Sequence, residues 1–118
     1  MKHAESDAQR LFVQRWRLDP RTRDLPACAI PNGGRRGARE AGILKAEGVS
    51  AGAPDWMLFA PREGRAGLAL EFKSATGRVS PAQAGWHAAL RQEAWTVHIV
   101  KSAAAAWEAV TDYLGIRA

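Results

Sequence analysis

The feature that most restricts the fold is a pair of almost entirely apolar segments, residues 56–60 and 68–73. Such segments are typical of strands that are covered on both faces, and the Pro-Arg-Glu-Gly sequence between them predicts a hairpin turn. The charged residues in these two segments are Glu71 and Lys73. A charge inside a buried strand is costly unless it has a partner, so these residues call for a specific explanation.

The hairpin suggests which charged residues face one another. If it is centred on Glu63, then Asp55 and Glu71 are directly opposed, because each lies eight residues from that centre. Opposed residues of an antiparallel pair share a face, with Cβ atoms about 5 Å apart. Lys73 lies two residues after Glu71 and points to the same face. The hairpin therefore predicts a cluster of two acids and one amine.

Two carboxylates at such a short distance repel each other, and a divalent cation such as Mg²⁺ or Mn²⁺ makes the pair tolerable. The cation could activate water for phosphodiester hydrolysis, while Lys73 orients or deprotonates that water or stabilises the developing charge. The alternative is a surface ion pair between Glu71 and Lys73, with Asp55 solvated where the strand starts.

The rest of the chain predicts further elements around this hairpin. We expect an amphipathic helix over about 5–18, a strand over 27–30, a basic helix over 35–47, a helix from 81 to about 93, a strand over 96–100 and a last helix capped by Ser102. The order is therefore α-β-α-β-β-α-β-α, an α/β fold with a mixed sheet and helices on both faces. At 118 residues we expect one domain, 1–118.

Composition indicates which class of partner and which cellular location to expect. The net charge of +5, with 17 Lys and Arg against 12 Asp and Glu, favours a polyanionic partner, although such a charge can also simply maintain solubility. The single cysteine, Cys28, excludes an intramolecular disulfide and is interpreted as a buried thiol. No run approaches the roughly 20 apolar residues of a membrane span, so we expect no membrane association and a cytoplasmic location in a bacterial or phage-infected cell.

Several short motifs together resemble one known family. They are Gly52-Ala53-Pro54-Asp55, Leu70-Glu71-Phe72-Lys73 and Gly77-Arg78-Val79-Ser80-Pro81-Ala82-Gln83, with Ile30-Pro31-Asn32-Gly33-Gly34 and Lys45-Ala46-Glu47-Gly48-Val49 upstream. In this combination the chain resembles the VRR-NUC domain, a branch of the PD-(D/E)xK nuclease superfamily. The resemblance extends from about Glu5 to Leu114 and implies a restriction-endonuclease-like fold.

The resemblance also implies a site. It assigns Asp55 and Glu71 as metal-binding acids, Lys73 as the catalytic lysine, Gln83 as a further active-site residue, and Glu5 and the backbone carbonyl of Phe72 as additional metal ligands. Two of these have simpler interpretations. Gln83 could only cap a helix, and Glu5 could be a solvated residue near the terminus, outside the helix if Ser6 and Gln9 form a capping box.

For the substrate, the resemblance implies a structure-selective DNA endonuclease of the phage or prophage type, acting as a homodimer on branched DNA such as four-way (Holliday) junctions in repair or recombination. Mg²⁺ or Mn²⁺ is the expected cofactor, with no small-molecule cofactor. We expect the basic residues Arg35, Arg36, Arg39, Lys45 and Arg78 to contact DNA phosphates, although they could instead form a solvated basic face. Two other functions stay open: a DNA-binding module with little turnover, and a nuclease acting on linear DNA or RNA.

Overall fold

A computed structural model describes residues 3–31 and 37–118. In this part of the chain the elements are α1 (His3–Leu18), β1 (Ala27–Ala29), α2 (Ala38–Ala46), β2 (Trp56–Leu58), β3 (Gly67–Phe72), α3 (Pro81–Gln92), β4 (Trp95–Val100) and α4 (Ala103–Leu114). Their order is the predicted one. None of the described helices combines the length and hydrophobicity needed to cross a membrane.

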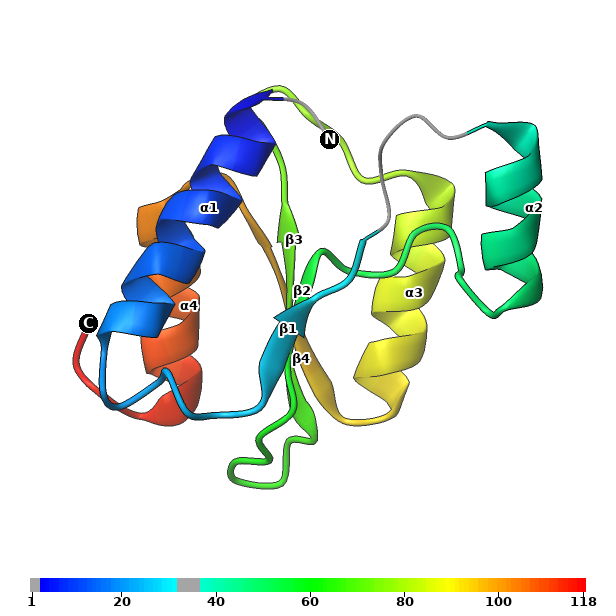
Figure 1. The fold of residues 1–118 in the computed structure, drawn as a ribbon. Helices are drawn as coiled ribbons and strands as arrows, with labels where there is room; N and C mark the ends of the chain where they lie inside the picture. Colours follow the sequence, from blue (N-terminus) through cyan, green and yellow to red (C-terminus); the bar gives the residue numbers. More distant parts are fainter. Residues whose placement is uncertain (1–2, 32–36) are drawn as a thin grey trace.

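The strands form one mixed sheet in the order β1-β2-β3-β4. β2 runs antiparallel to β1 and β3, whereas β4 runs parallel to β3 through the crossover helix α3. Helices α1 and α4 cover one face, α3 covers the other, and α2 lies outside α3 (Figure 1). The predicted mixed sheet with helices on both faces is confirmed.

The register between β2 and β3 is also the one the sequence predicts. Trp56 pairs with Leu70, and one further step places Asp55 opposite Glu71. The backbone N–H of Asp55 donates to the carbonyl oxygen of Leu70 at 3.1 Å, which extends the ladder beyond the end of β2. The two acids are therefore opposed across the antiparallel pair.

The turn that joins β2 and β3 is tighter than this register requires. Its central residues, Glu63 and Gly64, have φ values of 47° and 79°, and an isolated bridge closes around them. Positive φ at both central residues is the geometry of a two-residue hairpin turn. Between bridge and ladder, 59–61 on one side faces 66–67 on the other. The extra residue acts as a bulge and restores the register that opposes the acids.

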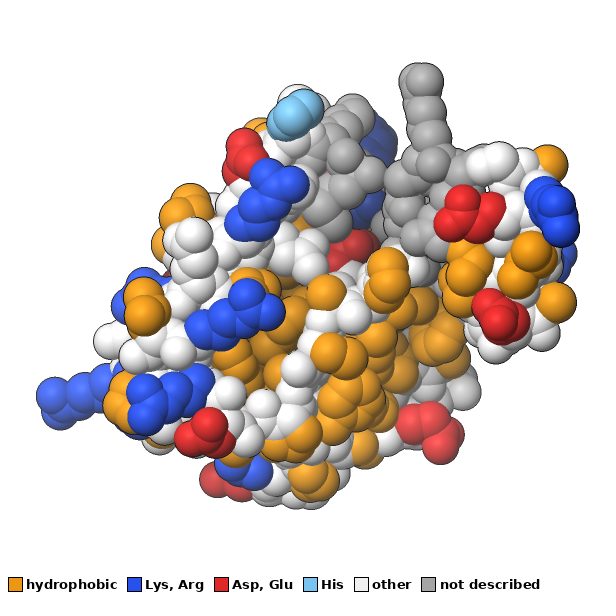
Figure 2. Space-filling view, in the orientation of Figure 1, with side chains coloured by type: hydrophobic (Ala, Val, Ile, Leu, Met, Phe, Trp, Pro, Cys, Tyr) orange, Lys and Arg blue, Asp and Glu red, His pale blue; other side chains and the backbone are white. Residues whose placement is uncertain are grey.

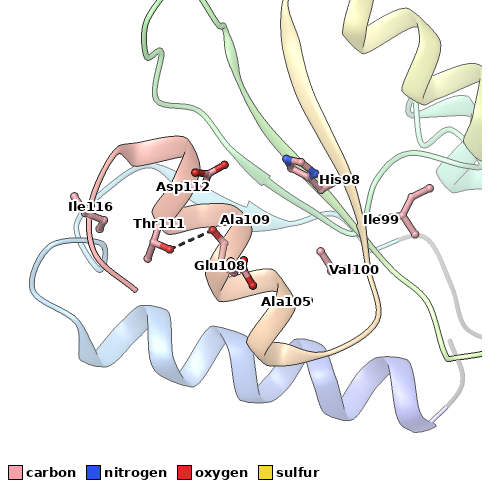
Figure 3. A pocket seen from close by; sticks show the side chains of 9 residues that line it. All are labelled: His98, Ile99, Val100, Ala105, Glu108, Ala109, Thr111, Asp112 and Ile116. Carbon is pink, nitrogen blue, oxygen red and sulfur yellow. Dashed lines mark hydrogen bonds between the residues drawn. The ribbon is translucent and has the colours of Figure 1, made fainter.

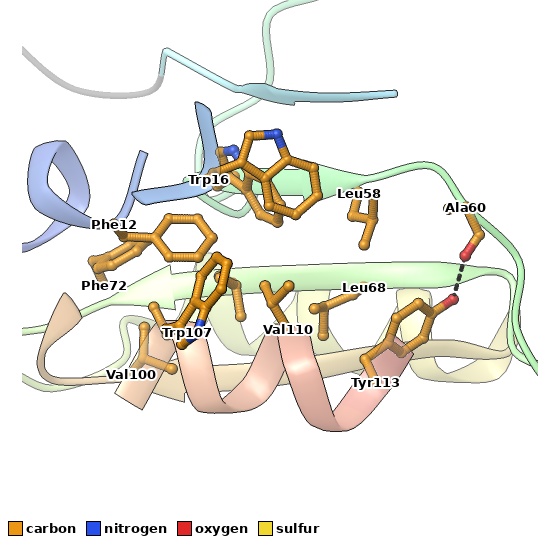
Figure 4. Packing of buried hydrophobic residues seen from close by; sticks show 13 residues of the cluster. Phe12, Trp16, Leu58, Ala60, Leu68, Phe72, Val100, Trp107, Val110 and Tyr113 are labelled. Atoms are coloured by element: carbon orange, nitrogen blue, oxygen red, sulfur yellow. Dashed lines mark hydrogen bonds between the residues drawn. The ribbon is translucent and has the colours of Figure 1, made fainter. Parts of the chain in front are cut away.

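Alternation along β2 and β3 divides the core into two clusters. The larger lies between the sheet and helices α1 and α4 (Figure 4); it contains Phe12, Trp16, Trp56, Leu58, Ala60, Leu68, Leu70, Phe72, Val100, Ala106, Trp107, Val110 and Tyr113. The smaller lies under α3 and contains Met57, Ala69, Leu90 and Val97. Because Leu70 and Phe72 belong to the larger cluster, Glu71 between them points toward α3.

Phe12 fixes α1 on the sheet. Its side chain is fully buried, and its ring lies 4.9 Å from that of Trp56 and 5.9 Å from that of Phe72. The helix begins at His3, which places Glu5 in its first turn. The alternative start, with Ser6 as the cap, is therefore wrong.

Two other features differ from expectation. Cys28 is exposed, because β1 is an edge strand and its outer positions remain uncovered. α2 starts at Ala38 rather than at residue 35, and it contains no buried residue. Among the described elements, α2 packs closely against no other helix or strand, and Ile43 on its surface is 50% exposed.

The loop before Asp55 packs closely against the start of α3, and this contact can be tested. Gly52 has a φ of +90°, and an added Cβ would lie 2.6 Å from the carbonyl carbon of Ala82 at the start of α3. We expect Gly52→Ala to lower the free energy of unfolding by about 2 kcal/mol or more, because backbone strain and the clash add together.

Gly85 offers the matched control, since it lies within α3 with open space around it. Gly85→Ala should raise the free energy of unfolding by about 0.5–1 kcal/mol. Chemical denaturation of both variants measures the difference. Shifts of the same sign would show that Gly52 is not constrained as described.

Candidate active site

The two acids meet where β2 begins and β3 ends. Asp55 is 8% exposed and Glu71 is 1% exposed. The Asp55 carboxylate accepts the backbone N–H of Phe72 at 2.7 Å, and the Asp55 carbonyl accepts the N–H of Ile30 at 2.8 Å. Asp55 also shares a side-chain hydrogen bond with Glu71. Backbone groups of two other strand ends thus hold Asp55 against its partner.

Glu71 is held from the other side by α3. Its Oε2 accepts a hydrogen bond from Nε2 of Gln83 at 3.2 Å, and its Oε1 lies 3.1 Å from Nε2 of His87. Burial, together with the hydrogen bond and charge of Asp55, raises the pKa of Glu71 to about 8, while the positive charge of Lys73 acts in the opposite direction. Near neutral pH Glu71 therefore keeps a proton.

His87 is a site residue that the sequence did not reveal. Its side chain is 3% exposed. Burial first, and then the charges of Arg91 and Lys73, lower its pKa, so the ring is neutral at pH 7 and can donate to Glu71. The available signal was its spacing, because His87 follows Gln83 by one helical turn and shares its face.

Gln83 fits both interpretations that were open. Its side-chain oxygen accepts the backbone N–H of Ser80 at 2.9 Å, and its backbone N–H donates to the Ser80 hydroxyl at 3.2 Å. These two bonds form a capping box at the start of α3. The remaining end of the amide donates to Glu71. One side chain therefore starts the helix and ties it to the buried carboxylate.

Lys73 follows β3 directly. Its backbone N–H donates to the carbonyl oxygen of Val100 at 2.9 Å, which continues the parallel ladder with β4. Its side chain is half-buried, and its charge lowers the pKa of both Glu71 and His87. The structure thus brings the predicted lysine to the predicted acids, at the carboxyl ends of two parallel strands.

The first helix also reaches the site. The charge of Glu5 contributes to the raised pKa of Glu71, and the side chain of Gln9 donates to the Asp55 carbonyl at 3.5 Å. The described residues include no group of three or more His, Cys, Asp or Glu side chains arranged to hold a metal. Glu5 is therefore near the acid pair without joining it in a closed cluster.

The predicted basic residues are dispersed. Arg39 and Lys45 are exposed on α2, and Arg78 is exposed in the loop before α3. Arg35 and Arg36 lie outside the described residues. In the part of the chain that is described, no hydrogen bond or ion pair joins Arg39, Lys45 or Arg78 to the acids.

Comparison with known proteins identifies the family and the fold. The sequence model of the VRR-NUC domain matches residues 3–104. The chain belongs to the VRR-NUC domain family. A solved structure described as "VRR_NUC domain protein" is similar, with a TM-score of 0.82 and 22% sequence identity over 98% of this chain and 92% of that chain, which shows a shared fold. None of the curated proteins compared matches the chain.

The raised pKa of Glu71 gives this VRR-NUC domain a distinctive pH dependence. The folded protein keeps a proton up to about pH 8, whereas the unfolded chain loses it near the ordinary value of 4.5. The resulting stabilisation is complete below that lower value and is lost as pH rises through the higher one. In metal-free buffer we expect the free energy of unfolding to fall by up to about 1.4 kcal/mol per pH unit between about pH 5 and 8.

Glu71→Gln should remove most of this slope, because the amide does not titrate. Glu63→Gln, on the exposed hairpin turn, is the control and should leave the slope unchanged. Urea denaturation at several pH values, with EDTA present, makes the comparison. An unchanged slope in Glu71→Gln would contradict the retention of a proton by Glu71.

Proposed function

We propose that this VRR-NUC protein is a metal-dependent endonuclease that hydrolyses phosphodiester bonds in branched DNA, such as four-way junctions, as a homodimer. The observation that carries the proposal is the buried pair of Asp55 and Glu71 beside Lys73. A buried acid pair that must keep a proton is a poor structural element, because burial of its charge is costly. It is, however, a suitable place for a divalent cation.

The donor chemistry fits such a cation. Carboxylate oxygens of Asp55 and Glu71, together with the carbonyl oxygen of Phe72, are the hard ligands that Mg²⁺ and Mn²⁺ prefer. The negative charge of Glu5 acts on Glu71 and would also favour a cation there. Mg²⁺ commonly uses one or two protein carboxylates and leaves its other positions to water and phosphate. When bound, the cation would polarise a phosphoryl oxygen and lower the pKa of a water ligand.

The other residues of the site have separate roles in the proposed reaction. Lys73 orients the attacking water or stabilises the charge that develops on the phosphate. Gln83 and His87 fix the two oxygens of Glu71, and the N–H of Phe72 fixes Asp55. Such positioning residues keep ligands in one orientation and limit the reorganisation needed during reaction.

Lys73→Ala tests the assignment directly. We expect cleavage to slow by about two to three orders of magnitude, as is typical when one charge-stabilising group is removed. Labelled four-way junction, splayed and linear duplex DNA of matched sequence are the substrates, with Mg²⁺, Mn²⁺ or EDTA. Arg62→Ala, on the hairpin turn at the opposite end of β2 and β3, removes one positive charge as a control and should cut normally.

The outcomes separate the alternatives. Metal-dependent cutting of the junction alone, lost in Lys73→Ala, supports the proposal. Equal cutting of linear DNA, or of RNA of the same sequence, favours the less selective nuclease. Tight junction binding without cutting under either metal favours the binding module. Wild-type rates in Lys73→Ala would remove the active-site assignment.

Helix α2 supports the homodimer. It lacks close packing against the other described elements, and a nine-residue helix is marginal without a partner. Arg39 and Glu47 lie four residues to either side of the half-exposed Ile43 on one face. An antiparallel contact between two copies, centred on Ile43, would pair Arg39 of each with Glu47 of the other. Two active sites could then act on the two strands of a junction.

Charge reversal tests this contact. Arg39→Glu and Glu47→Arg should each raise the dimer dissociation constant by about tenfold, since each reversal replaces two symmetric attractions with repulsions. The double variant should restore much of the affinity. Sedimentation equilibrium measures all four proteins. Single variants that dimerise as the wild type does would move the interface elsewhere on the protein.

A further inference from the structure

A hollow follows one flank of α1. It has a volume of about 420 Å³ and is lined by Ser6, Gln9, Arg10, Val13, Gln14 and Arg17. The spacing places all of these side chains on a single face of the helix. Figure 2 shows Lys and Arg side chains spaced along the α1 side of the molecule. Neither Asp55 nor Glu71 is among the described residues that line the hollow.

The position of the hollow connects it with the candidate active site. On the opposite flank of α1, the guanidinium of Arg15 lies 4.5 Å above the ring of Trp107, which marks the side of α4. The N-terminal end of the hollow is lined by Ser6 and by Gln9, whose side chain donates to the carbonyl of Asp55. The hollow therefore starts beside the acids and runs away from them along the helix.

The lining suits a phosphate backbone. Arg10 and Arg17 supply two positive charges, and the glutamine amides and the Ser6 hydroxyl supply neutral donors of the kind that contact DNA phosphates. None of the described residues that line the hollow is acidic. Asp7 pairs with Arg10 at 3.4 Å, but both side chains are largely exposed, at 64% and 73%, so this pair is weak and replaceable.

A second hollow has the opposite character. It lies between β4 and α4 and has a volume of about 450 Å³ (Figure 3). Glu108 and Asp112 contribute carboxylates to its lining, and none of the described residues around it is Lys or Arg. Those carboxylates would repel a phosphate backbone. Charge therefore favours the hollow on α1 as the place for a nucleic-acid strand.

The arginines of the loop that follows α1 provide a contrast. Arg21 donates to both carboxylate oxygens of Asp19, at 3.0 and 2.8 Å, and Arg23 lies 3.9 Å from Asp24. Among the described residues no ion pair involves Arg17. Arg17 therefore places a positive charge on the hollow that no ion pair among the described residues offsets, whereas Arg21 in the loop is held by a close two-point pair with Asp19.

We infer that one DNA strand runs from the scissile phosphate along this hollow, with Arg10 and Arg17 on its backbone. This path rests on the proposed function. The eight residue-to-residue steps from Gln9 to Arg17 span about 12 Å of helix, and a strand of duplex DNA has one phosphate per roughly 3.4 Å along its axis. This part of the hollow thus accommodates three to four nucleotides on one side of the cut.

The first test measures binding of labelled junction DNA in EDTA over a range of salt concentrations. In the double variant Arg10→Gln, Arg17→Gln, the slope of log K against log salt should decrease in magnitude by about 1.8, because each lost phosphate contact removes about 0.9. The control is Arg21→Gln, Arg23→Gln, which removes the same charge a short distance away and should keep the wild-type slope. A wild-type slope in the first variant would overturn the path.

The second test shortens one arm of the DNA, on each side of the cut in turn. Wild-type affinity should fall when one particular arm is trimmed to fewer than about four nucleotides, and the Arg10, Arg17 variant should not respond to that trimming. An identical response in both proteins would overturn the inference. Since binding is measured without metal, it is independent of cleavage: if the wild type cuts no substrate, the proposed function fails while the path is still tested.

Discussion

The structure depends on one constraint, the opposition of two buried carboxylates at the end of a hairpin. The register of β2 and β3 places Asp55 against Glu71, and both are almost inaccessible to solvent. Because two charges cannot be kept there without compensation, the pair holds a proton and draws donors from its surroundings. The amide of Gln83, the ring of His87 and the N–H of Phe72 are all oriented by this requirement.

The two faces of the sheet have different roles. One face carries most of the stabilising apolar core, and the other carries the buried acid, which is costly to bury. Period-two alternation sends Leu70 and Phe72 to the face covered by α1 and α4, where the aromatic cluster lies, and sends Glu71 to the face covered by α3. The apolar cluster under α3 is small. Apolar burial on the first face, at roughly 25 cal/mol per Å², therefore offsets the polar burial on the second, and α3 is free to carry polar side chains toward the strand ends.

Much of this arrangement could be predicted because it is local in the sequence. A short hairpin fixes which residues oppose one another, so the amino-acid order alone is enough to group Asp55, Glu71 and Lys73. His87 could not be assigned, because it reaches Glu71 from α3, whose packing against the sheet the hairpin does not determine, and a histidine on a helix has many possible environments. The exposure of Cys28 and the isolation of α2 were likewise hidden, since both depend on which elements cover them. The extra residue that corrects the register also leaves no clear mark in the sequence.

Under the proposed function, the charges at the site would link metal binding to DNA binding. With one proton on the acid pair, the charges of Asp55, Glu71, Glu5 and Lys73 sum to −1, which does not favour a phosphate. Exchange of that proton for a divalent cation would bring the sum to zero and remove the repulsion. The arginines along α1 stand apart from this balance, so they could hold the strand before the site is complete. Backbone binding would then require no metal, whereas entry of the scissile phosphate would require it.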